Sequence, residues 1–301
     1  MVSSSAIFVL AVALVLGSLY TPLDSNALFA TQKPLQHAVT SNNILLVTAH
    51  PDDEALFFAP TILALQSMPS VALSVVCLST GNAEGLGHVR KLELDRSLRV
   101  LGVDKMRILD HPELQDNQTA SWDAAVIASV LKRYVADFKI DTILTFDSSG
   151  ISSHPNHQSL PAGATALIQS LHPNPGQTSG AQLLRLFTLQ TTSLPLKYTS
   201  LLAVPLTKLD VYAFRLMQRF ERLILSIVAT WYPNLLDLTI PRNPEANAQP
   251  TFVSGYEAYG TAIEAMRAHE SQWVWFRYLY VAFSRYMWVN SYVEVRLPVE
   301  A

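Results

Sequence analysis

The chain has 301 residues, of which 50% are hydrophobic and 15% charged, with a formal net charge of −3. A chain of this length can bury a full core as one large domain. It has no basic stretch that could follow a phosphate backbone, which argues against nucleic acid as a partner. The single cysteine, Cys77, excludes an internal disulfide, and the positive mean hydropathy makes membrane contact plausible.

The N-terminal residues 6–20 are uncharged and almost uniformly apolar. With residues 2–5 they reach about the minimum length of a membrane-spanning helix. A cleaved signal peptide is the alternative, but no Lys or Arg precedes Lys33, so the usual basic start is missing. We expect an uncleaved anchor at residues 1–22 and a polar linker at residues 23–42. The sequon at Asn117 would carry a glycan if the domain faced a lumen.

After the linker, short apolar runs alternate with helical stretches, the pattern of βαβ units. It predicts a Rossmann-like, doubly wound α/β domain with a mainly parallel sheet over residues 43–292. The chemistry of such a domain belongs at the carboxyl ends of the strands. The expected strands are residues 44–48, 72–78, 106–109, 142–146 and 184–189. The expected helices are residues 54–66, 87–101, 122–136 and 158–170.

Beyond residue 190 the βα regularity is lost. Residues 223–236 are strongly apolar and fit either a core helix or a surface helix that dips into lipid. A further helix is expected near residues 257–270. The aromatic stretch at residues 273–290 fits the core better than lipid contact, because interfacial segments usually carry a charged face.

The first candidate strand is followed at once by His50, Asp52, Asp53 and Glu54. Crowded carboxylates raise one another's pKa unless a cation compensates, so such clusters tend to be functional. A helix start with Asp52 or Asp53 as N-cap would explain the acids without metal. It would not explain the histidine.

A second cluster, His154 to His157, follows the strand at residues 142–146. Both clusters therefore lie at the same edge of the predicted sheet. His50, Asp53 and His157 make a two-histidine, one-carboxylate set of the kind that binds catalytic divalent metals and leaves positions open. A metal there would make water a usable nucleophile toward an amide.

At these residues the chain resembles the metal-dependent N-acetylglucosaminyl de-N-acetylases, whose AHPDDE block corresponds to residues 49–54. The resemblance implies that His50, Asp53 and His157 bind the metal, most simply Zn²⁺. It implies that Asp52 is the general base and that His154 stabilises the oxyanion. Asn156 stands where many bacterial relatives have Asp, which leaves Asp52 as the base.

Two further blocks carry the resemblance. Arg90, with Glu93 three residues on, resembles a block that would bind phosphate or sugar hydroxyls, although a surface i,i+3 pair is an equal alternative. His269 resembles a histidine of the sugar pocket, with a packing role as its alternative. The aromatic C-terminal stretch resembles the eukaryotic branch.

The resemblance implies hydrolysis of N-acetylglucosaminyl-phosphatidylinositol, a membrane glycolipid, at the endoplasmic reticulum membrane with the catalytic domain in the cytoplasm. The rivals are a lumenal or secreted deacetylase of other N-acetylglucosamine conjugates and a non-catalytic glycolipid-binding homologue. A nucleotide-dependent oxidoreductase would need a GxGxxG turn after the first strand, which is missing.

Overall fold

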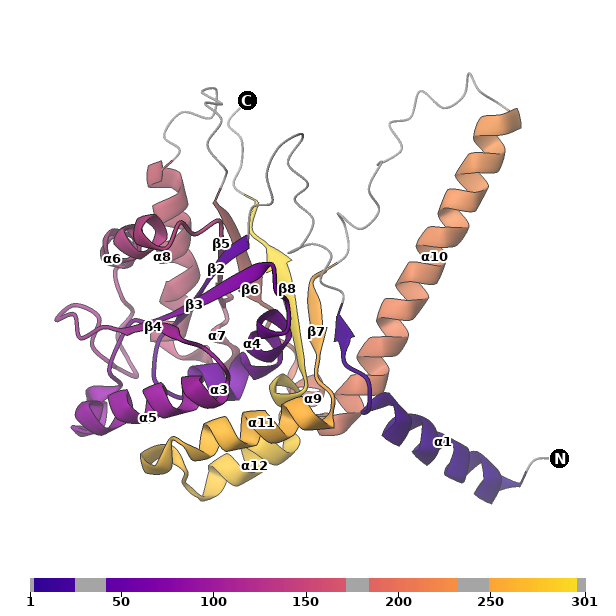
Figure 1. Cartoon of the computed structure of the whole chain (residues 1–301), viewed down its shortest axis with the longest axis horizontal. Helices are drawn as coiled ribbons and strands as arrows, with labels where there is room; N and C mark the ends of the chain where they lie inside the picture. The colour runs from indigo at the N-terminus through magenta and orange to yellow at the C-terminus, as the bar shows by residue number, and fades with distance from the viewer. Residues whose placement is uncertain (1–2, 25–41, 172–183, 232–248, 297–301) are drawn as a thin grey trace.

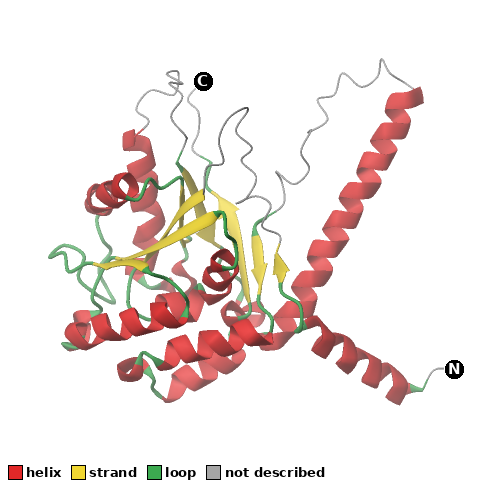
Figure 2. Cartoon of the chain, in the orientation of Figure 1, coloured by secondary structure: helices red, strands yellow, loops and turns green. Residues whose placement is uncertain are grey.

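The computed structural model describes residues 3–24, 42–171, 184–231 and 249–296. Its centre is an eight-stranded sheet with the order β1-β7-β8-β6-β5-β2-β3-β4. Helices surround this sheet, while α1 and α10 project away from it (Figures 1 and 2). The expected α/β fold is confirmed.

Five strands form the parallel part of the sheet, and each lies within two residues of its predicted bounds. They are β2 (Asn42–Thr48), β3 (Val71–Cys77), β4 (Lys105–Ile108), β5 (Thr142–Phe146) and β6 (Arg185–Leu189). Parallel strands covered on both faces read as continuous apolar runs, which is why the sequence reveals them. Every residue of β5 is buried.

The helices between these strands also follow the prediction, with one break. They are α3 (Asp53–Phe57), α4 (Ala59–Gln66), α5 (Gly87–Val100), α6 (Ala124–Asp137) and α8 (Pro155–Leu171). The single helix expected at residues 54–66 is interrupted at Phe58, where α3 ends and α4 begins. Pro60 has no N–H to continue the ladder of α3, so the chain starts a new helix there.

The order of the parallel strands creates a switch point. From β2 the chain runs outward through β3 to β4, then returns to the other side of β2 to form β5 and β6. The carboxyl ends of β2 and β5 therefore lie side by side where the winding reverses, which is where doubly wound sheets bind ligands. The histidine of the first cluster follows β2, and the second cluster follows β5.

An antiparallel extension was not predicted. β8 (Val289–Glu294) pairs with β6, β7 (Thr251–Val253) with β8, and β1 (Leu23–Asp24) with β7. Three residues of the expected linker, Leu23, Asp24 and Asn42, thus belong to the sheet. The rest of that linker, residues 25–41, lies outside the described residues.

The N-terminal apolar segment forms α1 (Ser4–Ser18), whose first turn is capped by Ser3. Its 15 residues make a rod of about 22 Å, whereas the hydrocarbon core of a bilayer is about 30 Å thick. Among the described helices, none has the length and apolarity needed to cross a membrane. The spanning anchor expected at residues 1–22 is therefore not supported.

The last third of the chain differs most from expectation. Residues 223–231 belong to the long helix α10 (Ala203–Trp231) and are largely exposed, so the core alternative is wrong for them; residues 232–236 lie outside the described residues. α11 (Tyr256–Arg267) is the expected helix, followed by the short helix η4 (Glu270–Gln272). The aromatic stretch divides into exposed α12 (Trp275–Phe283) and a buried part at residues 286–290.

Candidate metal centre

Two histidines from different strand ends meet at the switch point. His50 Nδ1 lies 3.2 Å from His157 Nε2, and both side chains are buried. The sequence predicts that these two histidines, 107 positions apart in the chain, lie close together, and the structure brings them together.

The hydrogen bonds of His157 Nδ1 and His50 Nε2, the ring nitrogens that point away from the gap, show which nitrogens keep a lone pair. His157 Nδ1 lies 3.1 Å from the carbonyl oxygen of Gly150, an acceptor, so Nδ1 carries the proton. His50 Nε2 lies 3.1 Å from Asn156 Oδ1 and 3.2 Å from Asp116 Oδ1, so it too is the donor. Two ring lone pairs therefore face each other across the gap.

This arrangement suits a cation. Two nitrogen ligands of a tetrahedral zinc ion stand roughly 3.3 Å apart, given bonds of about 2.0–2.1 Å. Asp53 Oδ1 lies 3.1 Å from His157 Nε2 and adds a carboxylate to the same gap. Lone pairs and a carboxylate repel one another unless a proton or a metal ion lies between them, so the donor set fits a divalent metal.

Asp53 is held by the turn that precedes it. Its Oδ2 accepts hydrogen bonds from the backbone N–H groups of Ala49 and His50, both at 2.9 Å. Burial favours a raised pKa, but the charges and hydrogen bonds of His157 and His50 outweigh it and lower the pKa of Asp53. The carboxylate is therefore ionised, as a metal ligand must be.

His154 belongs to the same cluster but is more open to solvent. Its ring and those of His50 and His157 offer nitrogens within 4.8 Å of one another, so a three-histidine set is a second way to bind metal here. Burial and the neighbouring His50 and His157 lower the pKa of His154 to about 4. Its Nδ1 accepts from the N–H of Asn156, which leaves Nε2 protonated and available as a neutral donor.

Asp52 lies at the start of α3 with a backbone φ of 107°, a conformation that costs a non-glycine residue energy. It occupies the N-cap position, as the helix-start alternative expects, but its side chain makes no capping bond. Instead Oδ2 accepts a hydrogen bond from Arg277 at 2.8 Å, and Arg90 lies 3.7 Å from Oδ1. Burial raises the pKa of Asp52, and the two guanidinium groups counteract it.

Arg90 is buried at the edge of this cluster. It donates to the carbonyl oxygens of Gly81 and Pro51 at 2.9 and 2.7 Å. A Cβ at Gly81, where φ is +67°, would meet the guanidinium at 2.5 Å, so glycine is needed for this approach. The surface pair with Glu93 is wrong, because Glu93 is buried and accepts from Ser271 instead.

His269 is completely buried and bonds to Glu54. This position suits the packing alternative. Direct contact of His269 with a sugar stays a prediction.

Two residues of the site were missed. Asp116, in the loop after β4, contacts His50 and lies 4.0 Å from His154 and 3.6 Å from Arg90. An acid that follows a parallel strand at the same sheet edge is a signal that could have revealed it. Arg277 reaches Asp52 from α12, 225 positions along the chain, and nothing local marks it.

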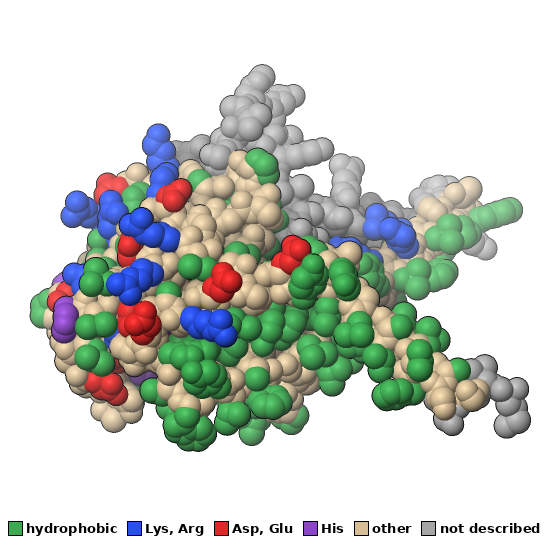
Figure 3. Space-filling view, turned by 60° about the horizontal axis from the view of Figure 1, so that its bottom comes forward, with side chains coloured by type: hydrophobic (Ala, Val, Ile, Leu, Met, Phe, Trp, Pro, Cys, Tyr) green, Lys and Arg blue, Asp and Glu red, His purple; other side chains and the backbone are tan. Residues whose placement is uncertain are grey.

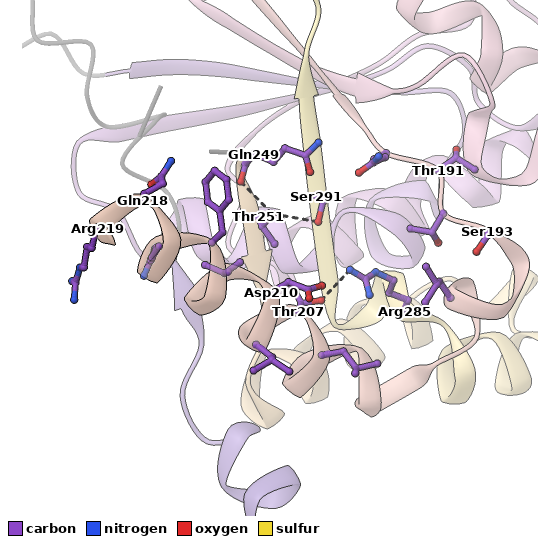
Figure 4. Close-up of a pocket in the computed structure, with 18 of the residues that line it drawn as sticks. Thr191, Ser193, Thr207, Asp210, Gln218, Arg219, Gln249, Thr251, Arg285 and Ser291 are labelled. Carbon is purple, nitrogen blue, oxygen red and sulfur yellow. Dashed lines mark hydrogen bonds between the residues drawn. The ribbon is translucent and has the colours of Figure 1, made fainter. Parts of the chain in front are cut away.

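A large cavity lies elsewhere in the described part of the chain. It has a volume of about 1160 Å³ and is lined by α10, β7, β8 and the segment after β6. Figure 4 shows Arg285 and Thr207 bonded to each other on its wall, with Thr251 and Ser291 bonded nearby. None of the clustered histidines lines it.

The fold is shared with known deacetylases. The N,N'-diacetylchitobiose deacetylase of Pyrococcus horikoshii superposes with a TM-score of 0.54 at 16% identity, covering 98% of this chain and 94% of that one. The zinc-inhibited form of a teicoplanin deacetylase gives a TM-score of 0.52 at 11% identity, covering 86% of this chain and all of that one. The chain thus shares the α/β fold of these two proteins.

Comparison with known sequences identifies the protein family. Residues 45–168 match the family described as GlcNAc-PI de-N-acetylase. The N-acetylglucosaminyl-phosphatidylinositol de-N-acetylase of Bos taurus is 35% identical over 82% of this chain and 81% of its own length. The protein of the same name from Saccharomyces cerevisiae is 32% identical over 93% and 91%. The chain belongs to the N-acetylglucosaminyl-phosphatidylinositol de-N-acetylase family.

Proposed function

We propose that the protein removes acetate from N-acetylglucosaminyl-phosphatidylinositol and leaves glucosaminyl-phosphatidylinositol, an early step of GPI anchor biosynthesis at the endoplasmic reticulum membrane. The observation that carries this proposal is the meeting of His50, Asp53 and His157 beside Asp52. Relatives named for this reaction, matched over most of their length, supply the substrate class.

His50, Asp53 and His157 would hold the divalent metal, with Zn²⁺ the best fit to their nitrogen and carboxylate donors. We prefer this set to the three histidines because Asp53 is fully enclosed and ionised, whereas His154 is more exposed and remains free for substrate. When bound there, the ion supplies Lewis acidity toward the amide carbonyl and toward water.

Asp52 is the proposed general base and acid. Its carboxylate takes a proton from the attacking water and later returns it to the departing amine. A raised pKa suits both steps, since the group must hold a proton between them. Arg277 holds the Asp52 carboxylate in one orientation through Oδ2, and this contact also fixes the position of Oδ1.

His154 is the proposed donor to the carbonyl oxygen as negative charge develops. Its neutral ring with a proton on Nε2 can donate without first becoming charged. Arg90 brings positive charge beside Asp52, and we retain it as the contact to sugar hydroxyls or phosphate.

The test follows acetate release from labelled N-acetylglucosaminyl-phosphatidylinositol, with and without a chelator, alongside metal analysis of the purified protein. We expect the chelator to abolish release and Asp52→Asn to lower turnover by about 10²–10⁴-fold with metal still bound. His157→Ala should lose the metal itself. Near-normal turnover by Asp52→Asn, or release that survives complete metal removal, would contradict the proposal.

A further inference from the structure

Exposed large hydrophobic side chains are confined to part of the molecule. Within residues 42–171, which hold most of the metal centre, only Leu92, Val100 and Leu171 are of this kind. The others lie in residues 7–20, which include most of α1, in residues 194–231 and in residues 256–293, which include α12. Figure 3 shows them gathered on the face that carries the helices at the bottom of Figure 1, continuing onto α1.

The centre of this face is a shallow groove of about 430 Å³ between Tyr198 and α12. We call it the aromatic surface and define it by its most exposed lining residues: Tyr198, Trp275, Phe276, Leu279 and Phe283. Trp275 is 74% exposed. The short helix η2 (Ser200–Leu202) adjoins α12 and extends the surface with Leu201 and Leu202 toward α10.

Charge is absent from the outside of this surface. Residues 191–209 and 271–293 contain no acidic residue. Their four basic side chains turn inward: Lys197 donates to Ile151, Lys208 to Ser18, Arg277 to Asp52 and Arg285 to Thr207. The exposed part of α12 therefore presents aromatic and aliphatic groups alone.

The helix that continues from this surface has the character of an interfacial helix. α10 exposes Leu216, Phe220 and Leu223 along one side, while Arg215 and Arg219 line the cavity on its other side. Residues 211–231 hold three arginines against a single acid, Glu221. A basic amphipathic helix with large apolar side chains suits the boundary between phosphate headgroups and acyl chains.

We propose that the aromatic surface lies in the headgroup and upper acyl region of a phospholipid bilayer, attaching the protein to one leaflet without crossing it. Trp and Tyr favour that level because their rings are apolar with one polar atom. A protein partner is disfavoured, because the arginines beside the apolar stripe of α10 match a phosphate layer adjoining hydrocarbon.

This placement deepens the proposed function and rests on it for its purpose. Helix α12 carries Phe276 and Phe283 on its exposed side and Arg277 to Asp52 on its inner side. Helix α12 therefore lies between the membrane plane and the proposed general base. A phosphatidylinositol headgroup could then reach the site while its acyl chains stay in the leaflet.

The experiment uses the full chain, whose only natural cysteine is Cys77. Cys77 is completely buried, so a cysteine introduced at the surface can be labelled selectively with an environment-sensitive dye. Leu279→Cys reports on the aromatic surface, and Leu92→Cys on α5 is the matched control, since both side chains are more than half exposed. Vesicles contain phosphatidylcholine with or without phosphatidylinositol, and with or without bromine on the acyl chains.

We expect the dye at position 279 to shift to the blue on vesicle addition and to lose intensity with brominated lipid, while the dye at position 92 does neither. The shift should be larger with phosphatidylinositol and smaller at high salt. Protein that binds vesicles with position 279 still in water overturns the proposal. So does a dimer that hides position 279 without lipid. Neither readout depends on turnover, so failure of the proposed reaction would show separately in the acetate assay.

Discussion

His269 Nε2 lies 2.6 Å from Glu54 Oε1, and neither side chain has any contact with solvent. Ser97 donates to the same carboxylate oxygen at 2.5 Å, and Glu54 Oε2 accepts from the N–H of Asp52. Two segments distant in sequence, around Ser97 and His269, are thereby tied to the residue that follows Asp53. Burial lowers the pKa of His269, but the Glu54 charge and hydrogen bond outweigh it and the net shift is upward.

Replacing one partner of this pair should destabilise the fold. We expect His269→Ala to lower the free energy of unfolding by about 3–5 kcal/mol, because it leaves a buried carboxylate without its partner. The exposed His88→Ala should change it by less than about 0.5 kcal/mol. Urea unfolding followed by circular dichroism measures both.

The same pair gives a pH dependence of stability. The pKa of His269 is raised in the folded protein, so its contribution is complete below the unfolded value of about 6.5 and is lost as pH rises through the folded value. The difference in unfolding free energy between wild type and His269→Ala should therefore shrink as pH rises from neutral into the alkaline range. A difference that grows with pH would contradict this sign.

Arg277 should set the acid limb of the activity profile. Its charge lowers the pKa of Asp52 against the effect of burial, so Arg277→Met should raise that pKa. The base must be ionised to accept a proton, and the acid limb of kcat/KM should move to higher pH. Arg277→Lys keeps the charge and should leave the limb nearer its original place. If Arg277→Met lowered activity equally at every pH, Arg277 would not act through Asp52.

Asp116 should govern metal affinity without binding the metal. It accepts from His50 Nε2 and so keeps the lone pair of Nδ1 directed at the centre. We expect Asp116→Asn to weaken metal binding by about 10–100-fold. The control is Asp110→Asn, an exposed carboxylate in the same loop. Competition with a fluorescent zinc chelator measures both affinities, and equal values would remove this role.

Two helical glycines should respond in opposite ways to alanine. A Cβ at Gly163 in α8 would lie 2.3 Å from Ile127 of α6, so Gly163→Ala should destabilise the fold by about 1–3 kcal/mol. Gly260 in α11 has open space at the same position, and Gly260→Ala should stabilise by up to about 1 kcal/mol. Thermal unfolding of the two variants checks the pair, and a stable Gly163→Ala would mean that α6 and α8 can separate.

The parallel half of the sheet and the two histidine clusters at its edge could be predicted from the sequence because their signals are local. Apolar runs mark buried parallel strands, and the clusters around His50 and His157 directly follow two of them. The antiparallel strands carry no such signal: β7 has three residues, β1 has two, and their pairing joins distant segments. Arg277 stayed hidden for the same reason, since tertiary packing alone brings it to the site.

The N-terminal helix shows the limit of composition as a guide. Its residues are as apolar as those of a spanning helix, but Pro22 and the pairing of β1 with β7 draw the chain back toward the sheet soon after Ser18. Helix α12 shows the converse. Its aromatic residues resemble a core segment, yet one side of the helix faces outward. The inner side is the one that carries Arg277 and Tyr280, which bond to Asp52 and Leu56.

The positive φ of Asp52 also bears on how this position can change over time. A glycine would relax the backbone there, but it would also leave the guanidinium of Arg277 without its carboxylate partner. The strained backbone and the buried ion pair therefore oppose each other at position 52. On the proposed mechanism, a descendant that had given up the reaction would no longer be selected to keep an acid here.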